Sequence, residues 1–372
     1  MRIVNRNGTT IVRKRLYLLF LISLSPFLSL LFMSCSMIDE DQSDCGVQAK
    51  VDYEMRLVTN MSTEIQTQLT TQMDLEMATA LRNYLSGIFT DYAHDVDLSF
   101  YDTVGDSVRL KHDRHIMDAN EASYTLNLPM RQYMHLAVAN LVDNDLVGLE
   151  KDEYCHPSML QQVARDTINS HDTGLFTARQ PMEVLEGVDQ SFKVRLYMAN
   201  CAACLIIDPR DHNTDGIKVF ATGFATGFNI CDSAFVFPKQ SPIVTTTELK
   251  PEGGSGERGY CCVTFPSRMS GKPAGSQTRT IIETEEPFIG DSGRETLWQF
   301  RVYVPHSSSE SRSSGEAYTE SILNVKNAQK AGELTIIKAH LGGNGEVETK
   351  ASEVTVSVTL DWKPGGEYHP HF

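Results

Sequence analysis

One cysteine near the start of the chain has the surroundings of a lipid-attachment site. Cys35 follows Leu31, Phe32, Met33 and Ser34, which approximates a lipobox with bulky Phe32 where Leu or Val is more usual. The processing chemistry needs a small residue before the cut and a thiol after it, because the thiol takes up a diacylglycerol before cleavage. The new amine is then acylated. Since several acyl chains anchor a protein durably whereas one is marginal, Cys35 is predicted to be lipidated.

The segment before this cysteine has the order of an export signal. Residues 1–34 contain five basic residues and no acid, and they lead into an apolar stretch over 16–33. Two alternatives stay open: ordinary secretory cleavage, and a retained signal anchor, because the stretch is near the roughly 18 residues that span a bilayer. Pro26 and the serines inside the stretch count against the anchor. Residues 35–46 then form an acidic tether with little apolar surface to bury.

The charge of the chain argues against nucleic acid as a partner. Loss of the leader removes five positive charges, which takes the formal net charge from −15 to −20. Phosphate binding needs clustered Lys and Arg, and the longest basic run, at 13–15, lies inside the leader. We therefore expect no nucleic-acid binding.

Seven further cysteines leave the redox chemistry open. They are Cys45, Cys155, Cys201, Cys204, Cys231, Cys261 and Cys262. The spacing Cys201-Ala-Ala-Cys204 invites a zinc or redox interpretation, but it lies in a predicted strand, where residues three apart point to opposite faces. A closed zinc site also needs four ligands. We expect no metal site, and buried thiols or an occasional disulfide whose pairing the sequence leaves open.

Two acid and histidine groups resemble catalytic pairs only superficially. They are Asp113-Arg114-His115 and His94-Asp95. Neither comes with a nucleophile elbow, a His-Glu-x-x-His helix or a glycine loop for phosphate. We predict no catalytic residues, no cofactor and no enzyme activity.

The elements that would position these groups are mostly strands. Period-two alternation over 47–57 predicts a half-buried strand, and similar short segments continue to the end of the chain. Helical spacing of apolar residues within 61–92 predicts one amphipathic helix. Residues 141–180 are predicted to be surface connections, with short helical pieces around Met159 to Ala164. The fold class is therefore all-β with one or two helices, in two domains at 47–190 and 191–372.

The last predicted strand, Glu353 to Trp362, is the cleanest of the series. Its alternate residues Val354, Val356, Val358, Leu360 and Trp362 share one side. An exposed sheet edge can accept an extended segment from a neighbour. These residues are therefore the candidate contacts with a partner strand, although a strand of this pattern more often completes its own domain.

Several short motifs, in order along the chain, resemble the FimB-type fimbrial subunits of Bacteroidota. The lipobox and acidic tether lead to Asp44-Cys45-Gly46. Residues 124–129 and 133–140 are similar to the family's hairpin of strand, Leu-Pro, short turn and strand ending in Ala-Asn. Residues 172–178 are similar to its Leu-Phe-Thr-Gly segment, and 356–366 is the most specific match.

The resemblance implies a fold as well as a family. Its members have two transthyretin-like β-sandwiches in tandem, which would follow the lipoprotein signal here. Departures are Gly46 where proline is frequent, Ala178 where glycine is usual, and the pair Cys201 and Cys204, which has no match in the family.

The resemblance also implies a function without turnover. It indicates a lipid-anchored accessory or anchor subunit of a cell-surface fimbria, held to the outer membrane through Cys35. Its partners would be shaft and accessory subunits. The alternative is a fimbrial tip or stand-alone surface adhesin, whose loops around 141–180 or 250–280 would bind a glycan or a host protein.

Overall fold

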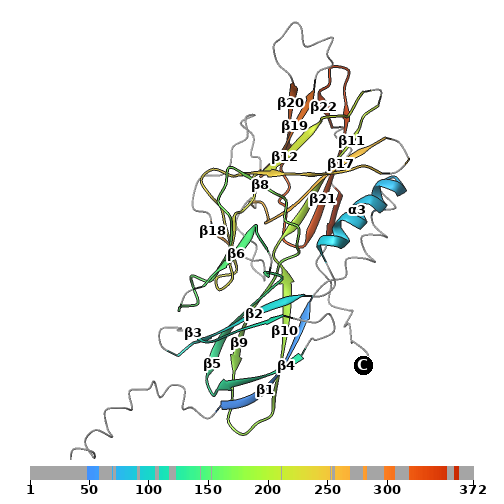
Figure 1. Cartoon of the computed structure of the whole chain (residues 1–372). Helices are drawn as coiled ribbons and strands as arrows, with labels where there is room; N and C mark the ends of the chain where they lie inside the picture. Colours follow the sequence, from blue (N-terminus) through green and yellow to red (C-terminus); the bar gives the residue numbers. More distant parts are fainter. Residues whose placement is uncertain are drawn as a thin grey trace, which may run out of the picture.

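The chain is mostly β-structure with a single α-helix in the part that the structure describes. The computed structural model describes residues 48–57, 69, 73–89, 93–104, 109–116, 123–142, 144–151, 153–210, 212–251, 253, 256–268, 280–282, 297–305, 318–349 and 356–359. Within them the strands form four sheets, and the helix is α3 (Leu75–Ile88) (Figure 1). None of the described helical segments is long and apolar enough to cross a bilayer. The predicted class, mainly β with a helix, is confirmed at this level.

The first sheet has seven strands, in the order β3-β2-β5-β9-β10-β1-β4. These are β1 (Gln48–Leu57), β2 (Asp95–Asp102), β3 (Arg109–Ile116), β4 (Ser123–Pro129), β5 (Gln132–Ala139), β9 (Phe176–Glu183) and β10 (Gln190–Met198). Val51, Tyr53 and Met55 of β1 are buried, as the alternation over 47–57 predicts.

One strand of the predicted second domain pairs with a strand of the predicted first domain. β10 falls in the predicted second domain, yet it pairs in parallel with β1, from Val51 opposite Gln190 to Leu57 opposite Leu196. The chain therefore leaves the first sheet after Met198 and not before residue 191. Alternation in β10 is the same whichever sheet the strand joins, so the sequence could not place it.

The second and third sheets pack face to face. The second sheet runs β16-β17-β11-β21-β22, with β23 also paired to β21, and the third runs β20-β19-β12-β15-β8. Their strands are β11 (Cys201–Asp208), β16 (Thr247–Leu249), β17 (Arg258–Thr264), β21 (Glu333–Leu341), β22 (Val347–Glu348), β23 (Val356–Thr359), β8 (Thr167–Ile168), β12 (Lys218–Thr222), β15 (Ile243–Thr245), β19 (Trp298–Pro305) and β20 (Tyr318–Val325). Leu205 and Ile207 meet Phe300 and Val302 in one buried cluster between these sheets, which we call the second core.

Helix α3 covers the opposite face of the second sheet, where it contacts β16 and β17. Met77, Leu81 and Leu85 are buried there with Cys204 and Ile206, in a cluster that also includes the inner face of the first sheet. We call this cluster the first core. The apolar spacing within 61–92 thus predicted the helix, and its described extent is shorter.

The fourth sheet includes two strands from the segment 141–180, which the sequence suggested was a set of surface connections. It runs β18-β14-β13-β7-β6, with β6 (Val147–Glu150), β7 (Met159–Gln162), β13 (Gly227–Asn229), β14 (Ala234–Val236) and β18 (Thr280–Ile282). The helical piece predicted around Met159 to Ala164 is wrong, because Met159, Leu160 and Gln161 pair with β13. Pairing with a strand almost seventy residues later decides this conformation. The outer face of β2 and β5 packs against the fourth sheet in a third core, which includes Tyr101, Leu136 and Phe228.

The molecule is elongated, with the first sheet at one end. In Figure 1, β1, β4 and the lower parts of β5 and β9 lie at one end, and β19, β20 and β22 lie at the other. β1 begins beside Pro129, and its residue Val51 lies opposite Gln190. The first described strand therefore starts at the end of the molecule distant from the third sheet.

Candidate partner-binding edge

The structure describes only part of the predicted site. Cys35 lies outside the described residues, as do Val354, Leu360 and Trp362. Val356 and Val358 lie in β23. The edge formed by β21 and β23 can therefore be built from the structure, whereas lipidation of Cys35 stays a prediction.

Strand β23 occupies the side of β21 that β11 leaves open. β11 pairs in parallel along β21, from Ala202 opposite Leu334 to Asp208 opposite His340. On the other side, Val356 lies opposite Ile336 and Val358 opposite Leu334, in antiparallel register. Within the described residues β23 pairs with β21 alone, so it forms an edge of the described part of this sheet.

The side chains of β21 are buried on both faces. Leu334 and Ile336 are fully buried in the first core, and Ala339 and Leu341 lie in the second core. A strand of this kind needs hydrogen-bond partners on both edges, because an unpaired backbone group away from water costs free energy comparable to a lost hydrogen bond. β23 supplies these partners over residues 333–336 of β21.

A buried glutamine fixes the start of β21. The Gln329 side-chain nitrogen donates to the carbonyl of Glu333 at 2.8 Å and to that of Ala202 at 3.2 Å. Its backbone N–H donates to the Ser267 hydroxyl at 2.8 Å, and its carbonyl accepts from the Ser267 N–H at 3.0 Å. These contacts tie β21 to β11 and to the segment after β17, so the position of β21 does not depend on β23 alone.

The end of β21 is closed by a short hairpin. β22 pairs Leu341 with Val347 and His340 with Glu348. The His340 Nε2 atom lies 3.3 Å from a carboxylate oxygen of Glu348. β22 and β23 thus share one edge of β21, each at its own end.

Four buried cysteines lie behind this edge as free thiols. Cys204 of β11 lies directly opposite Cys261 of β17, and Cys201 donates to the carbonyl of Thr264 at 3.4 Å. Burial raises the pKa of Cys262 to about 12 and raises the pKa of Cys201 and Cys261 well above the ordinary thiol value. Because the thiolate is the reactive form, these groups act as small apolar side chains in the core.

A buried aspartate that the sequence placed in a superficially catalytic pair has a structural role. Asp95 is fully buried, and its two carboxylate oxygens each accept a backbone N–H, from Leu141 and Val142, at 3.0 Å. It therefore holds the connection after β5. The side chains of Asp113, Arg114 and His115 lie outside the described set.

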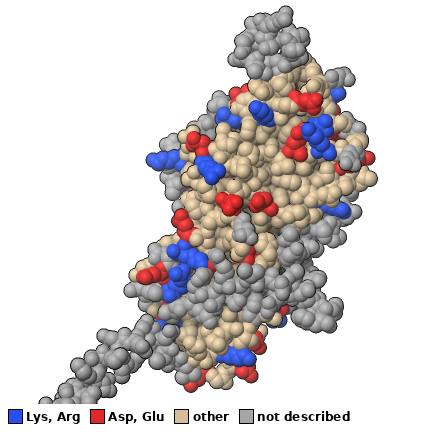
Figure 2. All heavy atoms as spheres, viewed as in Figure 1, with Lys and Arg blue, Asp and Glu red and all other residues tan. Residues whose placement is uncertain are grey.

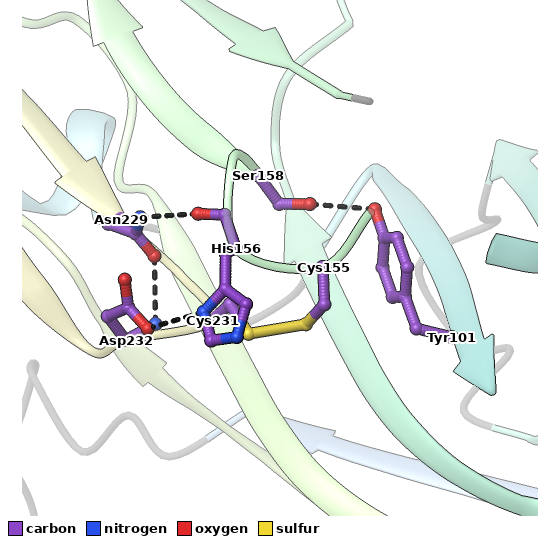
Figure 3. Close-up of a disulfide and its surroundings, with 7 residues drawn as sticks. All are labelled: Tyr101, Cys155, His156, Ser158, Asn229, Cys231 and Asp232. Atoms are coloured by element: carbon purple, nitrogen blue, oxygen red, sulfur yellow. Dashed lines mark hydrogen bonds and ion pairs between the residues drawn. A yellow bond between two sulfur atoms is a disulfide. The ribbon is translucent and has the colours of Figure 1, made fainter. Parts of the chain in front are cut away.

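One disulfide, whose pairing the sequence left open, joins Cys155 to Cys231. It joins the connection between β6 and β7 to the turn between β13 and β14 (Figure 3). Seven cysteines allow many pairings, and a separation of 76 residues gives no local signal. Only the adjacency of β7 and β13 brings these two together.

These features define a β-rich protein of four sheets with one strand edge completed by the C-terminal segment. No protein-family model matches the chain, and no curated protein matches it. Solved structures do resemble it across most of its length. One is a candidate adhesin from Bacteroides thetaiotaomicron, at 10% identity and a TM-score of 0.49, over 85% of this chain and 99% of that one.

Two further similar structures come from Porphyromonas gingivalis. The fimbrial anchor protein Mfa2 is 9% identical with a TM-score of 0.40, over 84% of this chain and 100% of its own. The tip fimbrial protein Mfa3, in a form with a C-terminal truncation, is 9% identical with a TM-score of 0.39 over the same shares.

Proposed function

We propose that this chain is a lipid-anchored accessory or anchor subunit of a cell-surface fimbria. Acyl chains on Cys35 hold it in the outer membrane, and the edge of the second sheet contacts a neighbouring subunit. The observation that carries the proposal is the position of β23, a C-terminal strand that completes β21 and presents an outer edge. Its motif, 356–366, is also the most specific part of the sequence resemblance.

The position of β1 is compatible with an anchor at Cys35. Thirteen positions separate Cys35 from Gln48, where β1 begins. Fully extended, a segment of that length spans up to about 45 Å. β1 begins at the end of the molecule distant from β19 and β20 (Figure 1). A membrane at Cys35 would then face the first sheet, and the second and third sheets would project away from it.

The predicted tandem arrangement belongs to the same proposal. The second and third sheets form a sandwich around the second core, and we propose it as the C-terminal transthyretin-like module. The first sheet would be the body of the N-terminal module, extended to include β10.

The surface charge favours a protein or carbohydrate neighbour over nucleic acid. Acidic and basic side chains are interspersed on the face that Figure 2 shows. The adhesin alternative relies on loops around 141–180 or 250–280, and the first of these segments contains β6, β7, β8 and the start of β9. No described contact favours that alternative.

Replacement of Cys35 tests the anchor. We expect Cys35→Ala to abolish incorporation of labelled fatty acid and to release the protein, or its fimbriae, into the medium. Cys45→Ala is the matched control, because Cys45 is nearby but follows no lipobox, and it should keep label and membrane retention. Unchanged labelling in Cys35→Ala would refute the mechanism.

A disulfide lock tests the role of the last strand. Thr335 and Ser357 lie directly opposite each other in the pairing of β21 with β23. Opposite residues of an antiparallel pair have Cα atoms about 4.5–5.5 Å apart, which a disulfide can bridge. If β23 stays in its own sheet and offers its outer edge, the oxidised double variant Thr335→Cys, Ser357→Cys should assemble fimbriae like wild type.

The opposite outcome identifies a donated strand. Loss of assembly in the oxidised variant, with recovery after reduction, would mean that β23 leaves β21 to join a neighbour. Wild type treated with the same reductant controls for effects on the native Cys155–Cys231 bond.

A further inference from the structure

The disulfide joins two connecting segments, and in each of them the cysteine is followed by another residue that can bind a metal ion. Cys155 is followed directly by His156, and Cys231 directly by Asp232 (Figure 3). The two cysteine Cα atoms are 5.9 Å apart, and both side chains are buried. The fold therefore brings two Cys-X pairs from distant parts of the chain to one place.

The polar groups of the two turns already meet. The His156 Nδ1 atom lies 3.0 Å from a carboxylate oxygen of Asp232, and the side chains are 75% and 39% exposed. One ligand atom each from His156, Cys231 and Asp232 lies within 4.8 Å of the others. The sulfurs thus form the buried floor of a small cluster, and the imidazole and carboxylate form its solvent-accessible side.

Hydrogen bonds hold these turns together independently of the sulfur bond. The Asn229 side chain donates to the carbonyl of His156 at 2.6 Å and accepts from the N–H of Asp232 at 2.8 Å. The N–H of Ile230 donates to the carbonyl of Ser158 at 3.0 Å. The Ser158 hydroxyl forms a hydrogen bond with the Tyr101 hydroxyl at 2.7 Å. Cleavage of the disulfide would therefore leave all four ligand groups close together.

We propose that reduction of this disulfide opens a metal site for Zn²⁺ or a similar borderline-soft divalent ion, with Cys155, Cys231, His156 and Asp232 as ligands. Two sulfurs, one imidazole nitrogen and one carboxylate oxygen match the ligand types and the number of four that Zn²⁺ takes in structural sites. In the oxidised protein the sulfurs are bonded to each other, which leaves only two ligands.

The cleavage needs a two-electron reductant, and we propose a dithiol. It transfers two electrons and two protons to the Cys155–Cys231 bond and becomes a disulfide itself. The two new thiols lose their protons when the metal binds, because thiolates are the ligands. The metal then replaces the covalent link between the β6–β7 connection and the β13–β14 turn under reducing conditions.

Cobalt binding is the direct test. The purified mature protein is reduced with a phosphine, desalted without oxygen and titrated with Co²⁺, whose thiolate complexes have a sulfur-to-metal charge-transfer band. We expect one equivalent to bind with this band in the reduced protein, and Zn²⁺ to displace it. We expect no such band in the oxidised protein. A reduced protein without the band would overturn the proposal.

Substitutions assign the band to these residues. His156→Ala and Asp232→Asn leave the disulfide intact, and each should weaken Co²⁺ binding to the reduced protein by about tenfold or more. His212→Ala and Asp215→Asn alter the same residue types in a separate loop and should change nothing. Unchanged affinity in both site variants would refute the assignment even if the cysteine variants fail to fold.

The cysteine pair provides the last arm. The double variant Cys155→Ser, Cys231→Ser should lose the charge-transfer band while its circular dichroism stays that of wild type. A band that persists in this variant would place the metal on the other thiols, such as Cys204 and Cys261, and would overturn the proposal.

Discussion

Two buried histidines show how differently one residue type can be accommodated. His135 is fully satisfied: its Nδ1 lies 3.1 Å from the carbonyl of Ser99 and its Nε2 lies 2.7 Å from the Tyr53 hydroxyl. Since a carbonyl only accepts, Nδ1 carries the proton, and Nε2 accepts from Tyr53. His171 packs edge-on against Phe265, and neither of its ring nitrogens has a hydrogen-bond partner among the residues that the structure describes.

Both histidines link stability to pH in the same direction. Burial lowers the pKa of His135 and of His171 from 6.5 to about 4. Between these values the unfolded chain binds protons that the folded protein does not. Stability is therefore complete above about pH 6.5 and is lost as the pH falls toward 4, by up to about 1.4 kcal/mol per pH unit for each histidine.

His171→Leu should stabilise the protein. It removes two unpartnered polar atoms, so we expect the free energy of unfolding at pH 7 to rise by about 1 kcal/mol. The loss of stability between pH 6.5 and 4 should also shrink by the share of one histidine. Urea unfolding at pH 7 and pH 5 measures both effects.

His135→Leu is the matched control, with the opposite sign. It removes two hydrogen bonds and should lower the free energy of unfolding at pH 7 by about 2 kcal/mol. If His171→Leu lowers the free energy of unfolding as much as His135→Leu does, His171 has a stabilising partner or packing role in the folded protein.

At the scale of elements, two glycines show how closely the end of α3 contacts the segment before β9. The N–H of Gly174 donates to the carbonyl of Ile88, in the last turn of α3, at 2.9 Å. A Cβ atom at Gly174 would lie 2.8 Å from the ring of buried Phe89. Gly87, directly before Ile88 in α3, has nothing within 4 Å of its Cβ position.

Alanine at these two glycines should have opposite effects. Gly174→Ala forces Phe89 or the end of α3 to move, so we expect a loss of about 1–3 kcal/mol in the free energy of unfolding. Gly87→Ala should raise it by up to about 1 kcal/mol, because alanine restricts the unfolded chain and favours helix. Thermal unfolding of both variants and wild type measures these changes. An unchanged stability of Gly174→Ala would mean that Phe89 moves aside at no cost.

At the scale of the whole molecule, each of two hydrophobic cores contains residues from more than one sheet. The first core combines the first sheet, α3 and the second sheet in one cluster. The third core joins the first sheet to the fourth. The Cys155–Cys231 bond and the hydrogen bond of Ser158 with Tyr101 add links between distant segments. We therefore expect the two predicted domains, 47–190 and 191–372, to unfold together.

Coincident probes test this cooperativity. Trp298 is fully buried in the second core, and its indole N–H donates to the carbonyl of Asn327 at 2.9 Å. In a Trp362→Phe background its fluorescence reports the second core alone, whereas far-ultraviolet circular dichroism reports all four sheets. The two urea transitions should coincide. Separate midpoints would show that the halves unfold as independent domains.

The sequence by itself determined the local elements. Alternation at Val51, Tyr53 and Met55 predicted a strand, and the spacing of Met77, Leu81 and Leu85 predicted the helix, because side-chain periodicity follows from backbone geometry alone. Of the predicted strand contacts, Val356 and Val358 are in a strand as expected. Lipidation of Cys35 rests on sequence only.

The tertiary structure alone decided which elements meet. It put β10 beside β1, made a strand of Met159–Gln162 through β13, and paired Cys155 with Cys231. It also left His171 unpartnered while it satisfied His135. Each of these outcomes depends on contacts between residues far apart in the chain, and short-range periodicity carries no information about such contacts.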